Sequence, residues 1–261
     1  MSSSAILEFQ SVSKYFRDRN NNIITAVDDV SLTLEKGKIL GLVGQSGSGK
    51  TTVARISVAL TPPSKGRVFV DGIDVKNIRN RKELWTKAQY IHQDPYSSLD
   101  PYMSVREVLE RPLRFLLHWK QSQLIEPISR MMDVIGLDMG FLDKRIQELS
   151  GGERQRIMIA RAFITNPVYA VADEPTTMID SIHRNSLLEL LLRLKKEFNT
   201  SFLLITHDLS IAADLCDDVA IMQNGKIIEY GPKDSVLKNP REQYTKDLLS
   251  ATPEKLVEAA S

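Results

Sequence analysis

Short apolar runs, separated by polar or glycine-containing segments, divide the chain into expected strands and helices. Near the N-terminus, the runs 6–9, 23–27 and 30–34 carry alternating and β-branched residues, which favour strands. The polar run 17–22 predicts a hairpin tip, and a further strand-like run covers 66–72. Together these runs predict an antiparallel β layer.

Farther along the chain, short buried strands alternate with longer helical patterns. Apolar runs too short to be helices lie at 39–43, 168–172 and 202–205. Helical spacing covers four segments, at 105–117, 126–135, 152–164 and 187–198. Asn224-Gly225, between two apolar runs, is typical of a two-residue hairpin turn. The alternation predicts an α/β fold with a mostly parallel sheet and helices on both faces.

The same pattern predicts how one large domain is organised. Residues 1–92 and 166–230 are expected to form the α/β core with its antiparallel β layer. The mostly helical stretch 93–165 is expected to be an inserted helical subdomain, and 231–261 a C-terminal helical tail.

Composition excludes several classes of protein. At 261 residues the chain is long enough for one such domain, and its net charge of +1 argues against a nucleic-acid binder, which normally carries a basic excess. The one cysteine, Cys216, excludes an internal disulfide and a multi-cysteine metal site. No apolar run approaches the roughly eighteen residues that span a bilayer, and the N-terminus lacks a signal-peptide pattern. We therefore expect a cytosolic chain that reaches a membrane only through a partner.

The apolar run 39–43 leads into a glycine-rich loop and then into helical spacing, which is the strand–loop–helix context of a P-loop. Glycines let the backbone curl so that its N–H groups form an anion-binding nest, and the following helix adds its positive end. Lys50 supplies a positive charge for the β- and γ-phosphates, and the Thr51 hydroxyl is a hard ligand suited to Mg²⁺. The residues expected to bind a nucleoside triphosphate here are Gly44, Gln45, Ser46, Gly47, Ser48, Gly49, Lys50, Thr51 and Thr52.

Two further positions have candidate chemistry and an alternative interpretation. Asp173 and Glu174 end a buried run, where a carboxylate can serve Mg²⁺ and its neighbour, pointing the other way on the strand, can take a proton from water. Such an acidic pair also occurs as a helix cap or turn. Phe16, before the polar loop, either stacks on an adenine ring or packs within the hairpin.

The stretch Leu149-Ser150-Gly151-Gly152-Glu153-Arg154-Gln155-Arg156 resembles the signature of the nucleotide-binding subunits of ABC transporters, and the resemblance extends over essentially the whole chain. Glu153 stands where Gln is usual. Ser150, Gly151 and Gly152 begin an expected helix and offer a hydroxyl, N–H groups and a dipole to an anion. In this family the signature closes over the ATP held by an opposite subunit, so two chains sandwich each nucleotide.

The resemblance implies a role for each matching residue. Gln93 is similar to the Q-loop glutamine, Glu174 to the catalytic glutamate and His207 to the switch histidine. Thr51, Gln93 and Asp173 are the implied Mg²⁺ ligands. The further matches are Phe16 for adenine stacking, Ser150 to Glu153 for the second phosphate site, and Asp180 for the D-loop. The fold implied is a P-loop NTPase core with an antiparallel β subdomain and an inserted helical subdomain.

Within the family the chain resembles the ATPases of oligopeptide and dipeptide importers. The stretches 93–101 and 231–249 are similar to the extended Q-loop and C-terminal stretch of that group. The implied partners are a second ATPase subunit, identical or, as in many such importers, different; transmembrane permease subunits; and, indirectly, an extracytoplasmic solute-binding protein. The chain is then expected at the cytoplasmic face of the membrane, with Tyr96 and Leu99 as hypothetical permease contacts.

Three alternatives remain at this point. Similar ATPases serve oligosaccharide and nickel importers, and no residue here identifies the solute. A soluble ABC-type ATPase without a membrane partner is a second class, although the paired domains or long insertions usual in its translation and repair members do not occur in this sequence. A P-loop kinase or GTPase is a third, but the stretch 149–156 has no role there.

Overall fold

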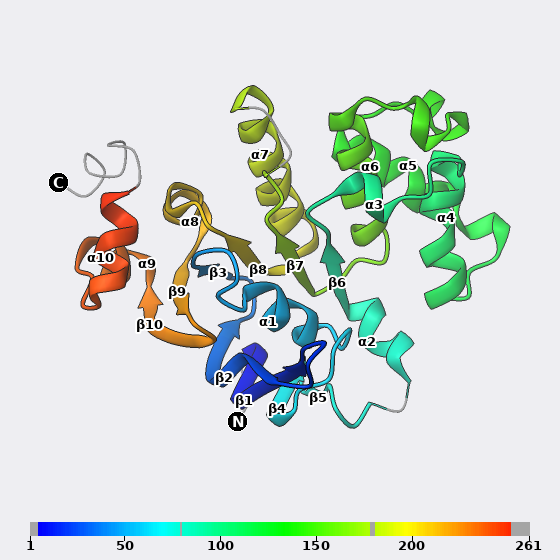
Figure 1. Ribbon diagram of the computed structural model, residues 1–261. Helices are drawn as coiled ribbons and strands as arrows, with labels where there is room; N and C mark the ends of the chain where they lie inside the picture. The colour runs from blue at the N-terminus through cyan, green and yellow to red at the C-terminus, as the bar shows by residue number, and fades with distance from the viewer. Residues whose placement is uncertain (1–4, 79, 178–180, 252–261) are drawn as a thin grey trace. The chain divides into compact units, whose positions relative to one another are not determined.

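The computed structural model describes residues 5–78, 80–177 and 181–251, and the chain divides into two compact units (Figure 1). The first unit comprises Met1–Arg79 and Ser201–Ser261, and the second comprises Asn80–Thr200. Within the described ranges, no helix is both long and apolar enough to cross a membrane.

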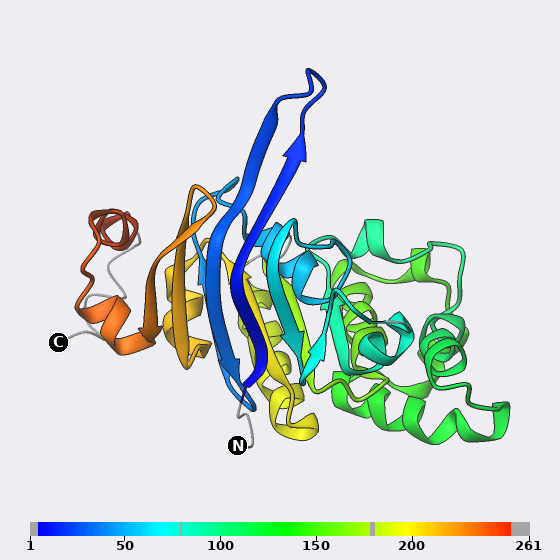
Figure 2. The same ribbon diagram turned by 90° about the horizontal axis from the view of Figure 1, so that it is seen from below.

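The predicted antiparallel layer is confirmed as a four-stranded sheet in the first unit, in the order β2-β1-β4-β5. Its strands are β1 (Ala5–Arg17), β2 (Ile23–Glu35), β4 (Lys65–Val70) and β5 (Ile73–Asp74). In Figure 2 the β1–β2 hairpin extends as a long ribbon that ends in the predicted polar tip.

The first two strands are longer than the apolar runs predict. Ser11 and Asp29, at polar interruptions of the pattern, have φ angles of 48° and 50° and lie within the strands as irregularities of the β1–β2 register. Hydroxyls from the partner strand satisfy their backbone: Ser11 N–H donates to Ser31 Oγ at 3.0 Å, and Asp29 N–H donates to Ser13 Oγ at 3.1 Å. Each interruption is therefore accommodated as a bulge, and the strand continues beyond it.

Four more strands of the first unit are ordered β10-β9-β3-β8. They are β3 (Ile39–Val43), β8 (Ser201–Thr206), β9 (Asp218–Gln223) and β10 (Lys226–Pro232). Strand β3 pairs in parallel with both β8 and β9, and every residue of β3 and β8 is buried, as central parallel strands require. The predicted hairpin is confirmed: Asn224 and Gly225 have φ angles of 47° and 82°, the two positive values that a type I′ turn requires.

The first unit has helices after three of its strands in the chain: after β3, after β8 and after β10. They are α1 (Lys50–Ser57), α8 (Leu209–Leu215), α9 (Lys233–Lys238) and α10 (Gln243–Ser250). The pattern placed Gly231 and Pro232 at the start of the helical tail, but they are the last residues of β10. Helix α9 begins directly after that strand, α10 follows α9, and both lie beside β10 in Figure 1.

The second unit combines a parallel strand pair with most of the helices. Strands β6 (Ala88–Ile91) and β7 (Tyr169–Asp173) pair in parallel. The α-helices are α2 (Arg81–Lys87), α3 (Pro95–Ser98), α4 (Val105–Leu116), α5 (Ile125–Ile135), α6 (Gly151–Phe163) and α7 (Ser181–Phe198), and 3-10 turns cover Gln121–Gln123, Met139–Asp143 and Ile146–Glu148. The helices expected at 105–117, 126–135 and 152–164 are confirmed, while the subdomain boundaries at 93–165 stay a prediction.

Candidate nucleotide-binding site

The glycine-rich loop lies between the buried strand β3 and helix α1, as its sequence predicts. Gly49, the residue before the helix, has a φ of 109°, and a Cβ there would lie 2.2 Å from the carbonyl oxygen of Ala26. A Cβ on Gly44 would lie equally close, at 2.2 Å, to the carbonyl oxygen of Met222. These contacts explain why both ends of the loop require glycine.

Two polar side chains of the loop and the start of α1 are buried. Lys50 is 4% exposed, and its ammonium donates to the carbonyl oxygens of Gly44 at 2.7 Å and Gln45 at 2.9 Å. Ser48 is 6% exposed, and its hydroxyl has no hydrogen-bond partner among the described residues. A buried ammonium and a buried, unsatisfied hydroxyl in one glycine-rich loop fit the phosphate oxygens of a nucleotide.

The two acidic residues lie at the end of β7, but only the first belongs to the strand. Asp173 is buried, and the hydroxyl of Tyr90 on β6 donates to its Oδ2. Glu174 has a φ of 44° and follows the last residue of β7, so the prediction that it lies on the strand is wrong. Its carboxylate accepts a hydrogen bond from the Thr177 hydroxyl at 3.0 Å. Tyr90 was missed because only pairing of β6 with β7 brings it to Asp173.

The signature stretch begins helix α6, as predicted, with Ser150 as its N-cap. Glu153 closes a capping box: its Oε2 accepts from the Ser150 N–H and the Ser150 hydroxyl, both at 2.8 Å. The Ser150 N–H, followed by its hydroxyl, holds the pKa of the Glu153 carboxyl below its usual value. Gly151 and Gly152 are exposed, and a Cβ on Gly152 would meet nothing within 4 Å. The helix start is therefore open, with its serine hydroxyl oriented by Glu153.

Replacing Glu153 by alanine is expected to lower the free energy of unfolding by about 1 kcal/mol, because the capping box is lost. The pKa of Glu153 is lower in the folded chain than its ordinary value of 4.5. The ionised carboxylate therefore stabilises the fold fully at pH values above 4.5, and this contribution is lost as the pH falls through the lowered pKa. The difference between wild type and variant, measured by urea unfolding, should therefore shrink at acidic pH. Glu153→Gln is the matched control, since its amide oxygen still accepts. A difference independent of pH would contradict this role of the charge.

The segment after Gln93 is tied to the signature helix. Gln93 is exposed and follows β6, and the next residue caps the short helix α3. On α3, the ring of Tyr96 has the Arg154 guanidinium 4.2 Å from its centroid, and the Ser98 carbonyl accepts from Arg161 at 2.6 Å. Both arginines belong to α6, so the Q-loop and the signature are joined within the second unit.

One of the two hypothetical permease contacts is wrong. Tyr96 is 60% exposed, but Leu99 is only 4% exposed and belongs to the core. The residue that follows α3 thus packs inward instead of presenting a surface.

The remaining predicted site residues lie at the ends of strands in the first unit. Phe16 is 42% exposed near the end of β1, with the Lys14 ammonium 5.1 Å from its ring centroid, so its ring is not enclosed by the hairpin. His207 is exposed and follows β8, directly before Asp208, the N-cap of α8. The predicted D-loop residue Asp180 lies outside the described residues.

Gln155 is a further site neighbour that the pattern did not single out. It is 4% exposed within α6, and its amide donates to the carbonyl oxygen of Pro175 at 2.6 Å. This bond connects the signature helix to the turn that carries Glu174. A buried polar residue on the apolar side of a helix was the available signal.

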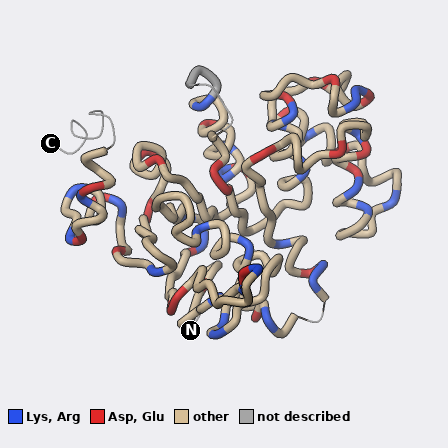
Figure 3. The backbone as a smooth tube through the Cα atoms, viewed as in Figure 1, with Lys and Arg blue, Asp and Glu red and all other residues tan. Residues whose placement is uncertain are grey.

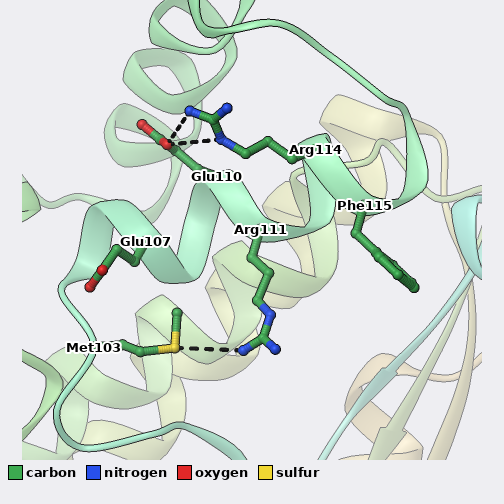
Figure 4. A pocket seen from close by; sticks show the side chains of 6 residues that line it. All are labelled: Met103, Glu107, Glu110, Arg111, Arg114 and Phe115. Carbon is green, nitrogen blue, oxygen red and sulfur yellow. Dashed lines mark hydrogen bonds and ion pairs between the residues drawn. The ribbon is translucent and has the colours of Figure 1, made fainter.

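A pocket of about 430 Å³ lies along α4 in the second unit (Figure 4). Its lining residues are Met103, Glu107, Glu110, Arg111, Arg114 and Phe115. Arg114 pairs with Glu110 at 2.9 Å, and Arg111 lies 3.8 Å from the Met103 sulfur. Phe115 is 53% exposed, and its ring projects from the end of the helix (Figure 4). The pocket thus combines charged walls with an exposed aromatic side chain.

A P-loop between a buried parallel strand and a helix defines a nucleotide-binding α/β protein. Comparison with known proteins shows the family to which this chain belongs. The family model for ABC transporters matches residues 27–177, and the chain belongs to this family. It is an ATPase, as the family's ATP-binding cassettes are. The predicted fold class, a P-loop NTPase core with a mostly parallel sheet, is thereby confirmed.

Curated relatives match nearly the full chain. The chain is 36% identical over 257 residues to the oligopeptide transport ATP-binding protein AppF of Bacillus subtilis (strain 168), covering 95% of this chain and 78% of that protein. It is 38% identical over 233 residues to the dipeptide transport ATP-binding protein DppF of Escherichia coli (strain K12), covering 88% of this chain and 70% of that protein.

Solved structures agree with this assignment. A dimeric ATP-binding cassette in a post-hydrolysis state, bound to ADP and Pi, has a TM-score of 0.77 at 26% identity, covering 87% of this chain and 98% of that one. CbiO1 from Clostridium perfringens, part of an ABC transporter complex, has a TM-score of 0.80 at 21% identity, over 99% of this chain and 100% of that one, and supports the fold alone.

Proposed function

We propose that this chain is the ATP-hydrolysing subunit that powers an importer of oligopeptides or dipeptides. The observation that carries the proposal is the match of nearly the whole chain to oligopeptide and dipeptide transport ATP-binding proteins. The chain attaches to the cytoplasmic face of the membrane through permease subunits, and the solute is bound by other proteins of the system.

The phosphate loop is proposed to hold the β- and γ-phosphates of ATP. When ATP binds, the Lys50 ammonium exchanges its hydrogen bonds to the Gly44 and Gln45 carbonyls for hydrogen bonds to the phosphate oxygens. The Ser48 hydroxyl gains a hydrogen-bond partner at the same time. Thr51, Gln93 and Asp173 offer the hard oxygens that Mg²⁺ prefers, and Tyr90 orients the Asp173 carboxylate. Bound Mg²⁺ would neutralise charge that develops between the phosphates.

Hydrolysis is proposed to depend on Glu174 as the general base. Its carboxylate takes the proton of the attacking water, while the Thr177 hydroxyl holds it in the turn after β7. His207 and Gln93 assist at the γ-phosphate, and Phe16 stacks on the adenine through its exposed ring. Positioning and charge stabilisation supply the rest of the catalysis.

Two chains are proposed to sandwich each nucleotide. The open start of α6, with Ser150, Gly151 and Gly152, offers N–H groups and a positive dipole to the ATP of the opposite subunit. Glu153 orients the Ser150 hydroxyl for that contact. The dimeric cassette among the solved relatives supports this arrangement. The second subunit is either a copy of this chain or a different ATPase of the same importer.

The permease is proposed to contact the second unit at the α4 pocket. An exposed aromatic side chain supports this surface, since Phe115 lines the pocket and is 53% exposed. Tyr96 and Tyr102 of the same unit are 60% and 71% exposed. Lys82 lies 4.1 Å from the Phe115 ring centroid and orients the ring. Leu99, being buried, has no part in it.

Phe115→Asp is expected to abolish peptide uptake while ATP hydrolysis by the isolated chain stays near wild type, because the change removes an exposed apolar contact and adds a charge. The measurement is uptake of a labelled peptide in cells that lack this chain but retain its permease. Ile125→Asp, at a 54% exposed position of the same unit outside the pocket lining, is the matched control and should support uptake. Failure of the wild type to restore uptake of any peptide would overturn the proposed function itself.

A further inference from the structure

The C-terminal tail reaches the phosphate loop from nearly the other end of the sequence. The backbone N–H of Gln45 donates to the hydroxyl oxygen of Tyr244 on α10 at 3.1 Å, across 199 positions of the chain. Both residues belong to the first unit. The bond therefore joins two parts of one compact body.

The peptide unit that Tyr244 contacts is the one that holds the loop lysine. Its carbonyl, from Gly44, accepts the Lys50 ammonium at 2.7 Å, while its N–H, from Gln45, donates to Tyr244. In a trans peptide the carbonyl and the N–H point in opposite directions. Holding the N–H toward the tail therefore turns the carbonyl toward Lys50.

The tail that carries Tyr244 is fixed to β10 through one carboxylate. Glu229 accepts from the Thr245 hydroxyl at 2.7 Å, the Arg241 N–H at 2.9 Å and the Glu242 N–H at 3.4 Å. Thr245 is fully buried. Partial burial opposes ionisation of Glu229, but the hydrogen bonds from Arg241, Thr245 and Glu242 outweigh it and lower its pKa. The charged carboxylate thus anchors the start of α10.

The register of the sheet places this anchor level with the loop. Glu229 on β10 pairs with Ile221 on β9, and Ile221 pairs with Val43, the last residue of β3 before the loop. The anchor, the strand pair and the beginning of the loop therefore lie in one row across three strands.

We propose that Tyr244 is a positioning residue for the phosphate loop: by holding the Gln45 N–H it fixes the Gly44–Gln45 peptide and so places the Lys50 ammonium before ATP binds. Glu229 and Thr245 are the anchor that keeps Tyr244 there. The proposal rests on the proposed function, in which Lys50 binds ATP phosphates. Its action is on the affinity for ATP, because an ordered loop loses less conformational entropy when the phosphates bind.

The test is the dissociation constant of a fluorescent ATP analogue for the full chain and its Tyr244→Phe variant. The variant keeps the ring and loses the hydroxyl acceptor, so the dissociation constant should rise roughly three- to ten-fold, the size of one net hydrogen bond. The turnover number at saturating ATP should stay near wild type. The midpoint of thermal unfolding without nucleotide should fall by only a few degrees, because one hydrogen bond of the folded chain is lost. A merely structural role would lower the midpoint in this way and leave the dissociation constant unchanged.

Tyr230→Phe is the matched control. Its hydroxyl also bonds a backbone group, donating to the Thr33 carbonyl at 2.6 Å, and Tyr230 adjoins Glu229 on β10. Its removal should leave the dissociation constant unchanged. Thr245→Val, which removes one donor to Glu229 at equal volume, should raise the constant less than Tyr244→Phe does, and no rise would overturn the role of the anchor.

The failure of this inference and that of the proposed function are distinguishable. If the wild type binds the analogue and Tyr244→Phe binds it equally well, the positioning role is wrong and the ATPase assignment stands. If the wild type does not bind the analogue, the proposed function fails first.

Discussion

Replacing Glu174 by glutamine is expected to lower the rate of ATP hydrolysis about 100- to 10,000-fold, the range that a general base contributes. Glutamine has nearly the same size, and its amide oxygen still accepts the Thr177 hydroxyl. It cannot take a proton from the attacking water. ATP affinity should therefore stay within a few-fold of wild type while phosphate release, measured at saturating ATP, falls.

Glu126→Gln is the matched control for this variant. It makes the same chemical change at an exposed position of α5 and should hydrolyse ATP at the wild-type rate. Equal loss in both variants would mean that the change acts through net charge or stability. An undiminished rate in Glu174→Gln would mean that another group accepts the proton.

Lys50→Ala is expected to weaken ATP binding about 10- to 150-fold, since hydrogen bonds to a charged group contribute roughly 1.5–3 kcal/mol. Hydrolysis should fall by a further factor of about 100, because the ammonium also stabilises charge that develops on the γ-phosphate. The lysine is the buried cation of the loop, held within it by two carbonyls. Titration calorimetry with ATP and a phosphate-release assay measure the two effects.

The control for Lys50 is Lys36→Ala. Lys36 is an exposed lysine of the same unit, paired with Asp71 at 3.0 Å, and its loss changes the net charge equally. Binding should be unaffected by this control. Wild-type affinity in Lys50→Ala would contradict the placement of the phosphates in the loop.

The parts of the structure set by local sequence were predictable. The phosphate loop, the signature helix start and the Asn224-Gly225 turn each depend on residues a few positions apart. Glycine, serine and asparagine act there through their own backbone preferences, so the sequence alone indicates the geometry.

The parts set by distant partners were not predictable. Ser11 and Asp29 look like strand ends, and only hydroxyls of the paired strand allow the strands to continue. Leu99 looks like part of an exposed loop until the helices of its unit bury it. Tyr244 meets Gln45 only because the sheet places β10 level with the loop. No pattern along the chain carries these contacts.

Glu174, the proposed general base, shows the same limit. Its residue type and place after a buried run predict a carboxylate at the strand end, and that is confirmed. Its place on the strand was mispredicted, because the strand ends at Asp173 and the alternation of side chains applies only within a strand. Glu174 has a positive φ, and its carbonyl accepts from the Thr177 N–H in the turn that follows the strand.

Basic and acidic residues are interspersed along the described parts of both units, consistent with the net charge of +1 (Figure 3). Chains with such balanced charge have little long-range repulsion to overcome when they pair. In the proposed dimer, closure around ATP would then depend on contacts to the nucleotide itself.

ATP is proposed to close two chains around it, and the molar mass of Glu174→Gln tests this proposal most directly. Light scattering after size exclusion, with and without ATP, measures the mass of a variant that binds ATP and does not consume it. ATP is expected to convert monomers into dimers, either of this chain alone or of this chain mixed with a companion ATPase. A variant that binds ATP yet stays monomeric, both alone and mixed with the companion ATPase, would contradict the proposal.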